Sequence, residues 1–219
     1  MSVEMVFDGV FKIDGKLATK NFVLGNKVYG EQLVSIDGTE YRLWNPYRSK
    51  LAAAILKGMK HMQIVPGSSV LYLGAATGTT CSHVSDIIGV SGIVYCVEIS
   101  ERSMRDLVKV CDKRQNMLPI LHDAMNPEAY EKDVGTVDII YQDVSSRMQA
   151  EILLRNSKML KKGGYAYVAI KSQSIDSAKK PKQVYDEFLD EVSEKFDFVE
   201  GIDIAPYSLL HLFAVLKKK

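Results

Sequence analysis

The chain has 219 residues, of which 47% are hydrophobic and 25% are charged, and its formal net charge is +1. This size and composition suit a globular protein with one α/β domain and a small additional one, and no apolar run approaches the roughly 20 residues that a membrane helix needs. A chain that binds nucleic acid alone is usually clearly basic, because phosphate contacts dominate the affinity. If RNA is the substrate, we therefore expect a partner to supply much of the binding.

The cysteines and the first residues bear on the cellular compartment. Cys81, Cys96 and Cys111 contain no C-x-x-C pair, which argues against a disulfide framework and against a zinc site. Residues 1–4 have neither a basic start nor an apolar segment, so we expect no secretory signal. We predict a cytoplasmic protein with buried, reduced thiols, no metal ion and no membrane attachment.

Residues 1–46 differ in character from the rest of the chain. The β-prone segments 10–13 and 41–44 lie among turn signals, and Asp14-Gly15 and Asp37-Gly38 suit hairpin turns that need positive φ angles. We therefore predict a small antiparallel β domain in this part.

A helix is predicted over residues 49–60, because Leu51, Ile55 and Met59 recur at intervals of four. We expect this helix to lead into the main domain, residues 47–219.

Strand and helix patterns alternate from Ser69 onward. Apolar residues at helical spacing separate the strands, namely Met104, Leu107, Val108 and Cys111, then Met148, Ile152 and Met159, then Val184, Phe188 and Val192. The predicted strands are 69–74, 92–98, 117–121, 136–142 and 164–170. This alternation indicates a mostly parallel sheet with helices on both faces.

The last part of the chain breaks this alternation. Residues 196–204 and 208–216 form two strand patterns joined by only three residues, Ala205-Pro206-Tyr207, and so short a link requires antiparallel pairing. A parallel sheet that ends in an antiparallel hairpin resembles the Rossmann-like fold of S-adenosylmethionine-dependent methyltransferases. We predict that α/β fold, with seven strands, preceded by the small β domain.

The segment 70–80, V-L-Y-L-G-A-A-T-G-T-T, carries a strand into a turn of small residues and then into a helix. Such a turn lets backbone amides approach a nucleotide-type ligand, and Thr79 and Thr80 are placed to cap the helix. Its spacing is not that of the dinucleotide pattern G-x-G-x-x-G. In the expected fold, Glu98 at the next strand end would accept hydrogen bonds from ribose hydroxyls, and His122-Asp123-Ala124 would contact the adenine amine.

Two charged residues follow adjacent predicted strands. Asp143 follows the strand 137–142 and Lys171 follows 165–170, so both lie at the carboxyl edge of the sheet, where ligands of open α/β folds bind. An ordinary surface ion pair, worth about 0 to 1 kcal/mol, is the simpler interpretation. A pair at a cofactor cleft favours a chemical role.

Several segments together resemble the fibrillarin family, the ribose 2′-O-methyltransferases of box C/D guide ribonucleoproteins. The resemblance covers nearly the whole chain and is closest to the archaeal form, since a glycine- and arginine-rich N-terminal extension is absent. Ser146 is a departure, because the family more often has glutamine there. The remaining segments are Y-C-V-E-I-S at 95–100, H-D-A at 122–124, D-I-I-Y-Q-D-V-S at 138–145, A-I-K-S at 169–172 and W-N-P-Y-R-S-K-L-A-A-A-I at 44–55.

The resemblance implies a catalytic group of Lys50, Asp143, Lys171 and His211. A ribose hydroxyl needs its proton removed or shared before it attacks, so Lys171 as a neutral amine is the candidate base. Lys50 and desolvation would lower the pKa of Lys171 while Asp143 would raise it, and the balance stays open at this stage. Asp143 has the alternative role of orienting Lys171 and the methyl group. His211 lies in an apolar strand and has the alternative role of a core histidine. The alternative role of Lys50 is a solvated lysine at the start of a helix.

The resemblance also implies which residues bind S-adenosylmethionine. A separate basic group could contact RNA phosphates or simply form a solvated helix face: Arg42, Arg48, Lys57 and Lys60. The implied cofactor-binding residues are Gly74, Ala75, Ala76, Gly78, Thr79, Thr80, Glu98, Ile99, Asp123, Ala124, Asp143, Val144, Ser145 and Ser146.

Guide-directed methylation of ribose 2′-hydroxyls in pre-rRNA or tRNA is the function that the resemblance implies. Its expected partners are a box C/D guide RNA with its target RNA, a Nop-domain scaffold protein and a kink-turn-binding ribosomal-type protein. The alternatives are a stand-alone methyltransferase for another RNA or a small molecule, a non-catalytic nucleotide-binding assembly module, and a nicotinamide oxidoreductase.

Overall fold

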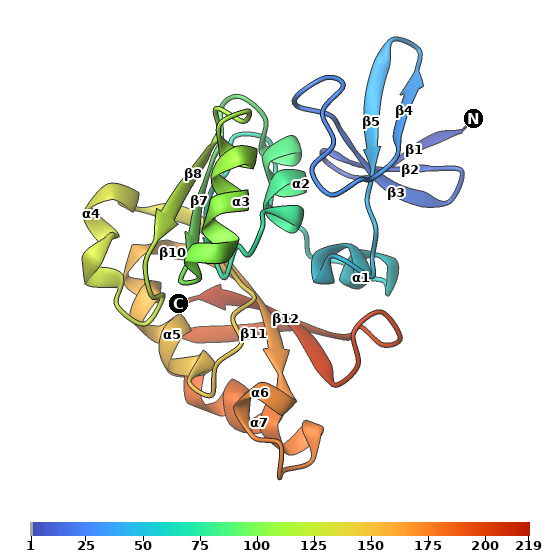
Figure 1. Ribbon diagram of the computed structural model, residues 1–219. Coiled ribbons are helices and arrows are strands. Elements are labelled where there is room, and N and C mark those ends of the chain that lie inside the picture. The colour runs from blue at the N-terminus through green and yellow to red at the C-terminus, as the bar shows by residue number, and fades with distance from the viewer. Residues whose placement is uncertain (1) are drawn as a thin grey trace.

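The computed structural model describes residues 2–219, whose strands form two separate sheets (Figure 1). Two Asp-Gly pairs occupy hairpin turns of the smaller sheet, as predicted, with φ angles of 47° and 81° at Asp14-Gly15 and of 48° and 77° at Asp37-Gly38. Type I′ turns need positive φ at both central residues, which explains these pairs. The smaller sheet is antiparallel, in the order β1-β2-β3-β5-β4, and contains β1 (Val3–Phe7), β2 (Val10–Ile13), β3 (Lys16–Lys20), β4 (Leu33–Ile36) and β5 (Thr39–Leu43).

The larger sheet has seven strands in the order β11-β12-β10-β9-β6-β7-β8. Strand β12 is antiparallel to both of its neighbours, and the other pairs are parallel. The predicted parallel sheet with an antiparallel C-terminal hairpin is therefore confirmed. Its strands are β6 (Ser69–Leu73), β7 (Ile93–Glu98), β8 (Met117–Leu121), β9 (Val137–Gln142), β10 (Leu160–Lys171), β11 (Phe196–Asp203) and β12 (His211–Lys218).

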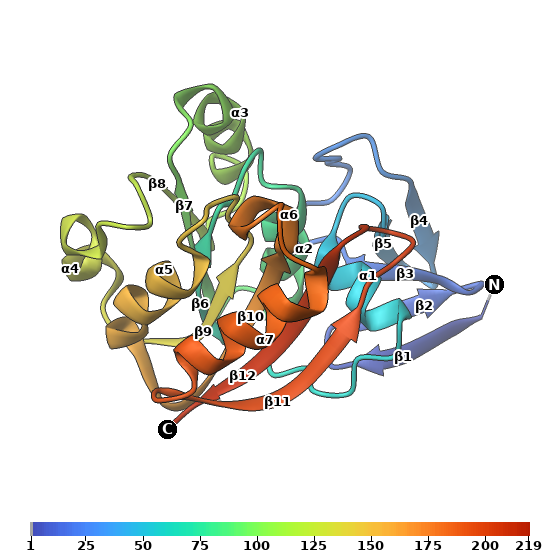
Figure 2. The same ribbon diagram turned by 90° about the horizontal axis from the view of Figure 1, so that it is seen from below.

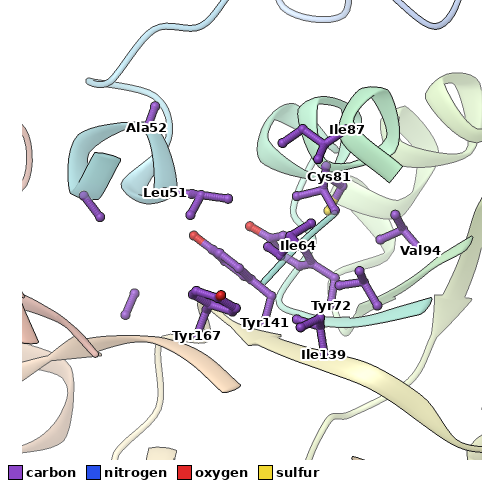
Figure 3. Close-up of a cluster of buried hydrophobic side chains, with 14 of the residues drawn as sticks. Leu51, Ala52, Ile64, Tyr72, Cys81, Ile87, Val94, Ile139, Tyr141 and Tyr167 are labelled. Atoms are coloured by element: carbon purple, nitrogen blue, oxygen red, sulfur yellow. The ribbon is translucent and has the colours of Figure 1, made fainter. Parts of the chain in front are cut away.

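Helices cover both faces of the larger sheet (Figure 2). One core joins the sheet to α1, α2 and α3, and Figure 3 shows Leu51 of α1 close to Tyr141 and Tyr167 of the sheet. The other core lies beneath α4, α5 and α7, and includes Leu153 and Phe188. The helices are α1 (Lys50–Leu56), α2 (Thr79–Ile88), α3 (Glu101–Cys111), α4 (Glu131–Val134), α5 (Gln149–Asn156), α6 (Ser172–Ile175) and α7 (Pro181–Val192), with 3₁₀ turns at Pro127–Ala129 and Ser157–Met159.

Within residues 2–219, no helix is both long enough and apolar enough to cross a membrane. The cysteines that the structure describes, Cys81, Cys96 and Cys111, are free and buried.

Several predicted boundaries were wrong. Helix α1 ends at Leu56, four residues before the prediction, because Gly58 adopts a left-handed conformation with a φ of 93°. Strand β12 begins at His211 instead of residue 208, because the amides of Tyr207 and Ser208 donate to the Ile204 carbonyl and extend the connecting loop. Propensity alone does not locate such turn hydrogen bonds.

Two residues predicted to lie within helices lie elsewhere. Met148 is 49% exposed and precedes the first turn of α5, and Met159 lies in a 3₁₀ turn. Val108 lies in α3 as predicted, but it is exposed, and the buried face of this helix is formed by Met104, Leu107 and Cys111.

The small sheet is attached to α2 by a buried group of ion pairs. Arg42 of β5 is fully buried, 2.6 Å from a carboxylate oxygen of Glu31 and 2.8 Å from one of Asp86 on α2. Arg114 contacts the other oxygen of Asp86 at 2.7 Å. Both alternatives considered for Arg42, an RNA phosphate contact and a solvated helix face, were therefore wrong, because its guanidinium is enclosed by carboxylates. The division of the chain at residue 46 stays a prediction.

Candidate active site

Four strand ends meet at one edge of the larger sheet. The sheet order places β9 between β6 and β10, so Gly74, Asp143 and Lys171 lie at the carboxyl ends of three neighbouring strands, and Glu98 ends β7 beside them. A cavity of about 690 Å³ opens at this edge. Cavities of this size hold small organic ligands and cofactors.

The cavity brings together most of the predicted site residues. Of the residues that the structure describes, Ala75, Gly78, Thr79, Thr80 and His211 are predicted site residues that do not line it. The predicted residues that line it are Lys50, Gly74, Ala76, Glu98, Ile99, Asp123, Ala124, Asp143, Val144, Ser145, Ser146 and Lys171, together with His122.

Sequence reasoning missed five lining residues: Val97, Ser103, Met125, Met148 and Ile152. Met148 and Ile152 are four residues apart at the start of α5, shortly after Asp143. Their spacing was used only to predict a helix, although their position directly after the strand-end loop also fits a cavity wall.

The carboxylate of Asp143 lies between two lysines. Lys171 Nζ is 2.8 Å from Asp143 Oδ1 and also donates to the Asp143 carbonyl at 2.9 Å and to Ser145 Oγ at 3.1 Å. Lys50 Nζ, from the first residue of α1, is 2.9 Å from each carboxylate oxygen. The side chains of Lys50, Asp143 and Lys171 are only 22%, 15% and 11% exposed, so solvent screens this cluster weakly.

The net effect on Lys171 is a lowered pKa. Burial has the largest effect and lowers the pKa, and the charge of Lys50 lowers it further, whereas Asp143 raises it. Desolvation disfavours an ammonium group, so burial outweighs the carboxylate here. A larger fraction of Lys171 is therefore neutral at a given pH than for an ordinary lysine.

His211 lies beside Lys171, its register partner in the antiparallel pair of β12 and β10. Its Nδ1 is 2.6 Å from the Leu209 carbonyl oxygen, and since a carbonyl can only accept, Nδ1 carries the proton. Burial lowers the pKa of His211, which keeps Nε2 available as an acceptor in the neutral ring.

The turn after β6 is shaped by close backbone approaches. Gly74 has a φ of 83°, and a Cβ at this position would lie 2.9 Å from the Asp143 carbonyl oxygen. The carboxylate of Glu98 accepts the amide of Ala76 at 2.7 Å and that of Ser100 at 2.8 Å. Because a carboxylate has about four acceptor positions, Glu98 can still accept further hydrogen bonds.

The predicted capping of α2 by threonines was wrong. The N-cap is Gly78, with a φ of 88° and no side-chain capping bond, and Thr79 and Thr80 are already inside the helix. Thr80 Oγ1 instead donates to Ser49 Oγ at 3.1 Å, and Ser49 is the N-cap of α1.

A family model described as Fibrillarin matches the chain over residues 1–219. A protein from Thermococcus onnurineus, named fibrillarin-like rRNA/tRNA 2′-O-methyltransferase, is 51% identical to this chain over 218 residues, which are 97% of this chain and 96% of the relative.

Solved structures are similar over almost the full length. A fibrillarin pre-rRNA processing protein from Methanococcus jannaschii has a TM-score of 0.95 and 45% identity, covering 99% of this chain and 97% of its own. Aeropyrum pernix fibrillarin, solved with natively bound S-adenosyl-L-methionine, has a TM-score of 0.91 and 42% identity, covering 99% and 98%. A chain from a fibrillarin/Nop5p complex has a TM-score of 0.89 and 38% identity, covering 99% and 100%.

Proposed function

The chain belongs to the fibrillarin family, and on this premise we propose that it transfers the methyl group of S-adenosylmethionine to ribose 2′-hydroxyls of RNA, at positions chosen by a box C/D guide RNA. The observation that carries the proposal for this chain is the cluster of Asp143 with Lys50 and Lys171, which lines the strand-end cavity. It places a buried amine with a lowered pKa next to a ligand-sized space.

The cavity walls fit S-adenosylmethionine. Gly74 has no side chain at a point where a Cβ would collide with the backbone of Asp143. Glu98 retains acceptor positions suited to ribose hydroxyls. Asp123 and Ala124 line the cavity after β8, a position suited to the adenine. We assign cofactor contacts to the predicted residues that line the cavity, and a supporting role to Ala75, Gly78, Thr79 and Thr80.

When bound, S-adenosylmethionine supplies a sulfonium methyl group for attack by the ribose oxygen. In our proposal Lys171 Nζ, as the neutral amine, accepts the proton of the 2′-hydroxyl. Asp143 then stabilises the ammonium group, since its Oδ1 lies 2.8 Å from that nitrogen. The 2.9 Å contacts of Lys50 hold the Asp143 carboxylate in place, and orientation of the reacting groups supplies a large part of the rate.

His211 has a supporting role in this proposal. It faces Lys171 across the β10–β12 pair, and its neutral ring leaves Nε2 free to accept a hydrogen bond from the ribose or from water. The core role considered for this histidine fits less well, because its side chain is only half-buried.

A scaffold protein of the Nop type is the proposed partner, in line with the related chain solved in a fibrillarin/Nop5p complex. We further propose that guide RNA and a kink-turn-binding protein complete the assembly. The net charge of +1 supports this division of labour, because it is low for a chain that binds RNA alone.

The test is a labelled methyl-transfer assay on a target RNA, with and without an assembled box C/D guide complex. We expect transfer only with the guide complex and only to the nucleotide that the guide specifies. Efficient methylation of naked RNA would favour the stand-alone alternative. S-adenosylmethionine binding without any transfer in the complete complex would favour the assembly module.

A further inference from the structure

A buried hydroxyl pair connects the start of α1 to the start of α2. Thr80 Oγ1 donates to Ser49 Oγ at 3.1 Å, and the two residues are 7% and 3% exposed. Ser49 Oγ also accepts the Ala52 amide as the N-cap of α1. We propose that Ser49 and Thr80 are positioning residues. They hold the N-terminus of α1 so that Lys50, its first residue, keeps its contact with the Asp143 carboxylate. This inference rests on the proposed function.

The geometry explains why such an anchor is needed. Helix α1 has only seven residues, and a helix of this length is not stable without tertiary contacts. Its apolar side chains pack into the core below, where Figure 3 shows Leu51 near Tyr141. Apolar packing is not directional, so it does not fix the position of the first turn of α1 relative to α2 to a fraction of an ångström. A hydrogen bond between two buried hydroxyls does restrict that position, because it needs a narrow range of distances and angles.

Thr80, the donor of this hydrogen bond, lies close in sequence to the turn that lines the cavity. Thr80 lies in the first turn of α2, which begins directly after the turn that contains Gly74 and Ala76, both cavity-lining residues. Ser49 precedes Lys50, which also lines the cavity and contacts Asp143. The Ser49–Thr80 bond therefore sets the position of Lys50 relative to the turn that faces the cofactor.

A displaced Lys50 would change the behaviour of Lys171. The titratable groups that face Lys171 are Asp143 after β9, Lys50 from α1 and His211 from β12. Its neutral polar neighbours are Ser145, which accepts from its amine, and Gln149 of α5, which accepts from its backbone amide. If Lys50 moves away, Lys171 loses a neighbouring positive charge and keeps its carboxylate. Its pKa then rises, and a base of higher pKa is neutral only at higher pH.

The test compares Thr80→Val with wild type in the complete guide complex. Loss of one buried hydrogen bond corresponds to a fall in kcat of about fivefold, and we expect this fall without a change in KM for S-adenosylmethionine. We also expect the acidic limb of the pH–rate profile to move to higher pH. Thr80→Ser, which keeps the hydroxyl, should restore both.

Two further variants separate positioning from general stability. Ser49→Gly removes the acceptor, and glycine is well tolerated at an N-cap, so it should reproduce the changes seen with Thr80→Val. Ser68→Ala is the matched control, because Ser68 is 5% exposed and accepts the Val65 amide at 3.1 Å, with no link to Lys50. It should leave the pH–rate profile unchanged.

A double-mutant cycle makes the inference sharper. If Thr80 acts through Lys50, then Thr80→Val causes no further loss in a Lys50→Met background. Additive losses, or a wild-type profile in Thr80→Val, would overturn the inference while the proposed function stands. A raised KM for S-adenosylmethionine with unchanged kcat would also overturn it and assign Thr80 to cofactor binding. An inactive wild-type complex would overturn the proposed function itself.

Discussion

Two carboxylates in this molecule each lie between two basic side chains, but the basic residues differ. Asp86 is enclosed by Arg42 and Arg114 at 2.8 and 2.7 Å, and all three side chains are fully shielded from solvent. Asp143 lies between Lys50 and Lys171 at a cavity, at similar distances.

The kind of cation separates a structural cluster from a reactive one. A guanidinium stays protonated at any working pH and offers several fixed donors, so it suits a permanent buried contact. A lysine changes its pKa readily when buried, and here the pKa of Lys171 is lowered. The Asp86 cluster therefore joins the small sheet to α2, whereas the Asp143 cluster can exchange a proton.

The largest expected effect comes from giving the Asp143 cluster an arginine. Lys171→Arg can still pair with Asp143, but its guanidinium cannot accept the 2′-hydroxyl proton. We expect methyl transfer to fall by up to about 10⁴-fold in single-turnover assays with the guide complex. Calorimetry should show that S-adenosylmethionine still binds. A variant that retains most of the wild-type rate would remove Lys171 as the base.

Removal of the carboxylate from the Asp86 cluster should lower the stability of the fold. Asp86→Ala leaves Arg42 and Arg114 buried without their shared carboxylate, and we expect the free energy of unfolding to fall by about 3–5 kcal/mol in urea titrations. Asp106→Ala is the control, because it removes only an exposed pair with Lys109 at 2.7 Å. Equal losses in the two variants would show that the Asp86 cluster contributes no more to stability than an exposed ion pair.

The Asp143 cluster could be predicted from the sequence, and the Asp86 cluster could not. Asp143 and Lys171 each follow a recognisable strand, and parallel strands deliver their carboxyl ends to one edge. The partners of Asp86 come from β5 and from the loop after α3, and no periodicity in the sequence pairs them. This is why Arg42 was grouped with basic residues that could contact RNA phosphates or form a solvated helix face.

Local geometry accounts for the remaining errors. Thr79 and Thr80 have the right residue type for capping, but the left-handed Gly78 takes the N-cap, and Thr80 is directed to Ser49 of another helix. The direction of the pKa shift of Lys171 also needed the structure, because burial and two opposite charges act at once. The sequence names those groups but not their distances.

His83, which packs beside the Asp86 cluster, makes the stability of that region depend on pH. Its Nδ1 contacts Thr19 Oγ1 at 2.8 Å and its Nε2 contacts the Tyr29 hydroxyl at 2.8 Å. Since the Thr19 hydroxyl already donates to Asp86, His83 Nδ1 carries the proton and Nε2 accepts. Burial first, then Arg42 and Arg114, lower the pKa of His83 well below its usual value, so the folded protein holds it neutral.

This arrangement predicts acid sensitivity for the region that joins the small sheet to α2. Below about pH 6.5 the unfolded chain binds a proton at His83 that the folded chain does not, so stability should fall by about 1.4 kcal/mol per pH unit. His83→Gln should lack this component of the slope in urea titrations between about pH 7 and pH 5. Identical slopes in the two proteins would contradict a neutral buried His83.

The smallest effect expected from this comparison of the two clusters tests how strongly Lys50 lowers the pKa of Lys171. Lys50→Met removes a positive charge beside Lys171 and leaves Asp143 to pair with Lys171 alone, so the pKa of Lys171 should rise. A general base works only in its neutral form, and the rise therefore moves the acidic limb of the pH–rate profile to higher pH. At neutral pH we expect a loss of about tenfold, which shrinks as the pH is raised.

Measuring that profile also separates two roles for Lys50. If Lys50 only holds Asp143 in place, its removal lowers the rate by the same factor at every pH. If it also lowers the pKa of Lys171, alkaline solution rescues the variant. The Asp86 cluster offers the matching negative result, because arginines do not titrate in this range: replacement of Arg42 should leave the shape of the pH–rate profile unchanged, whatever it does to stability.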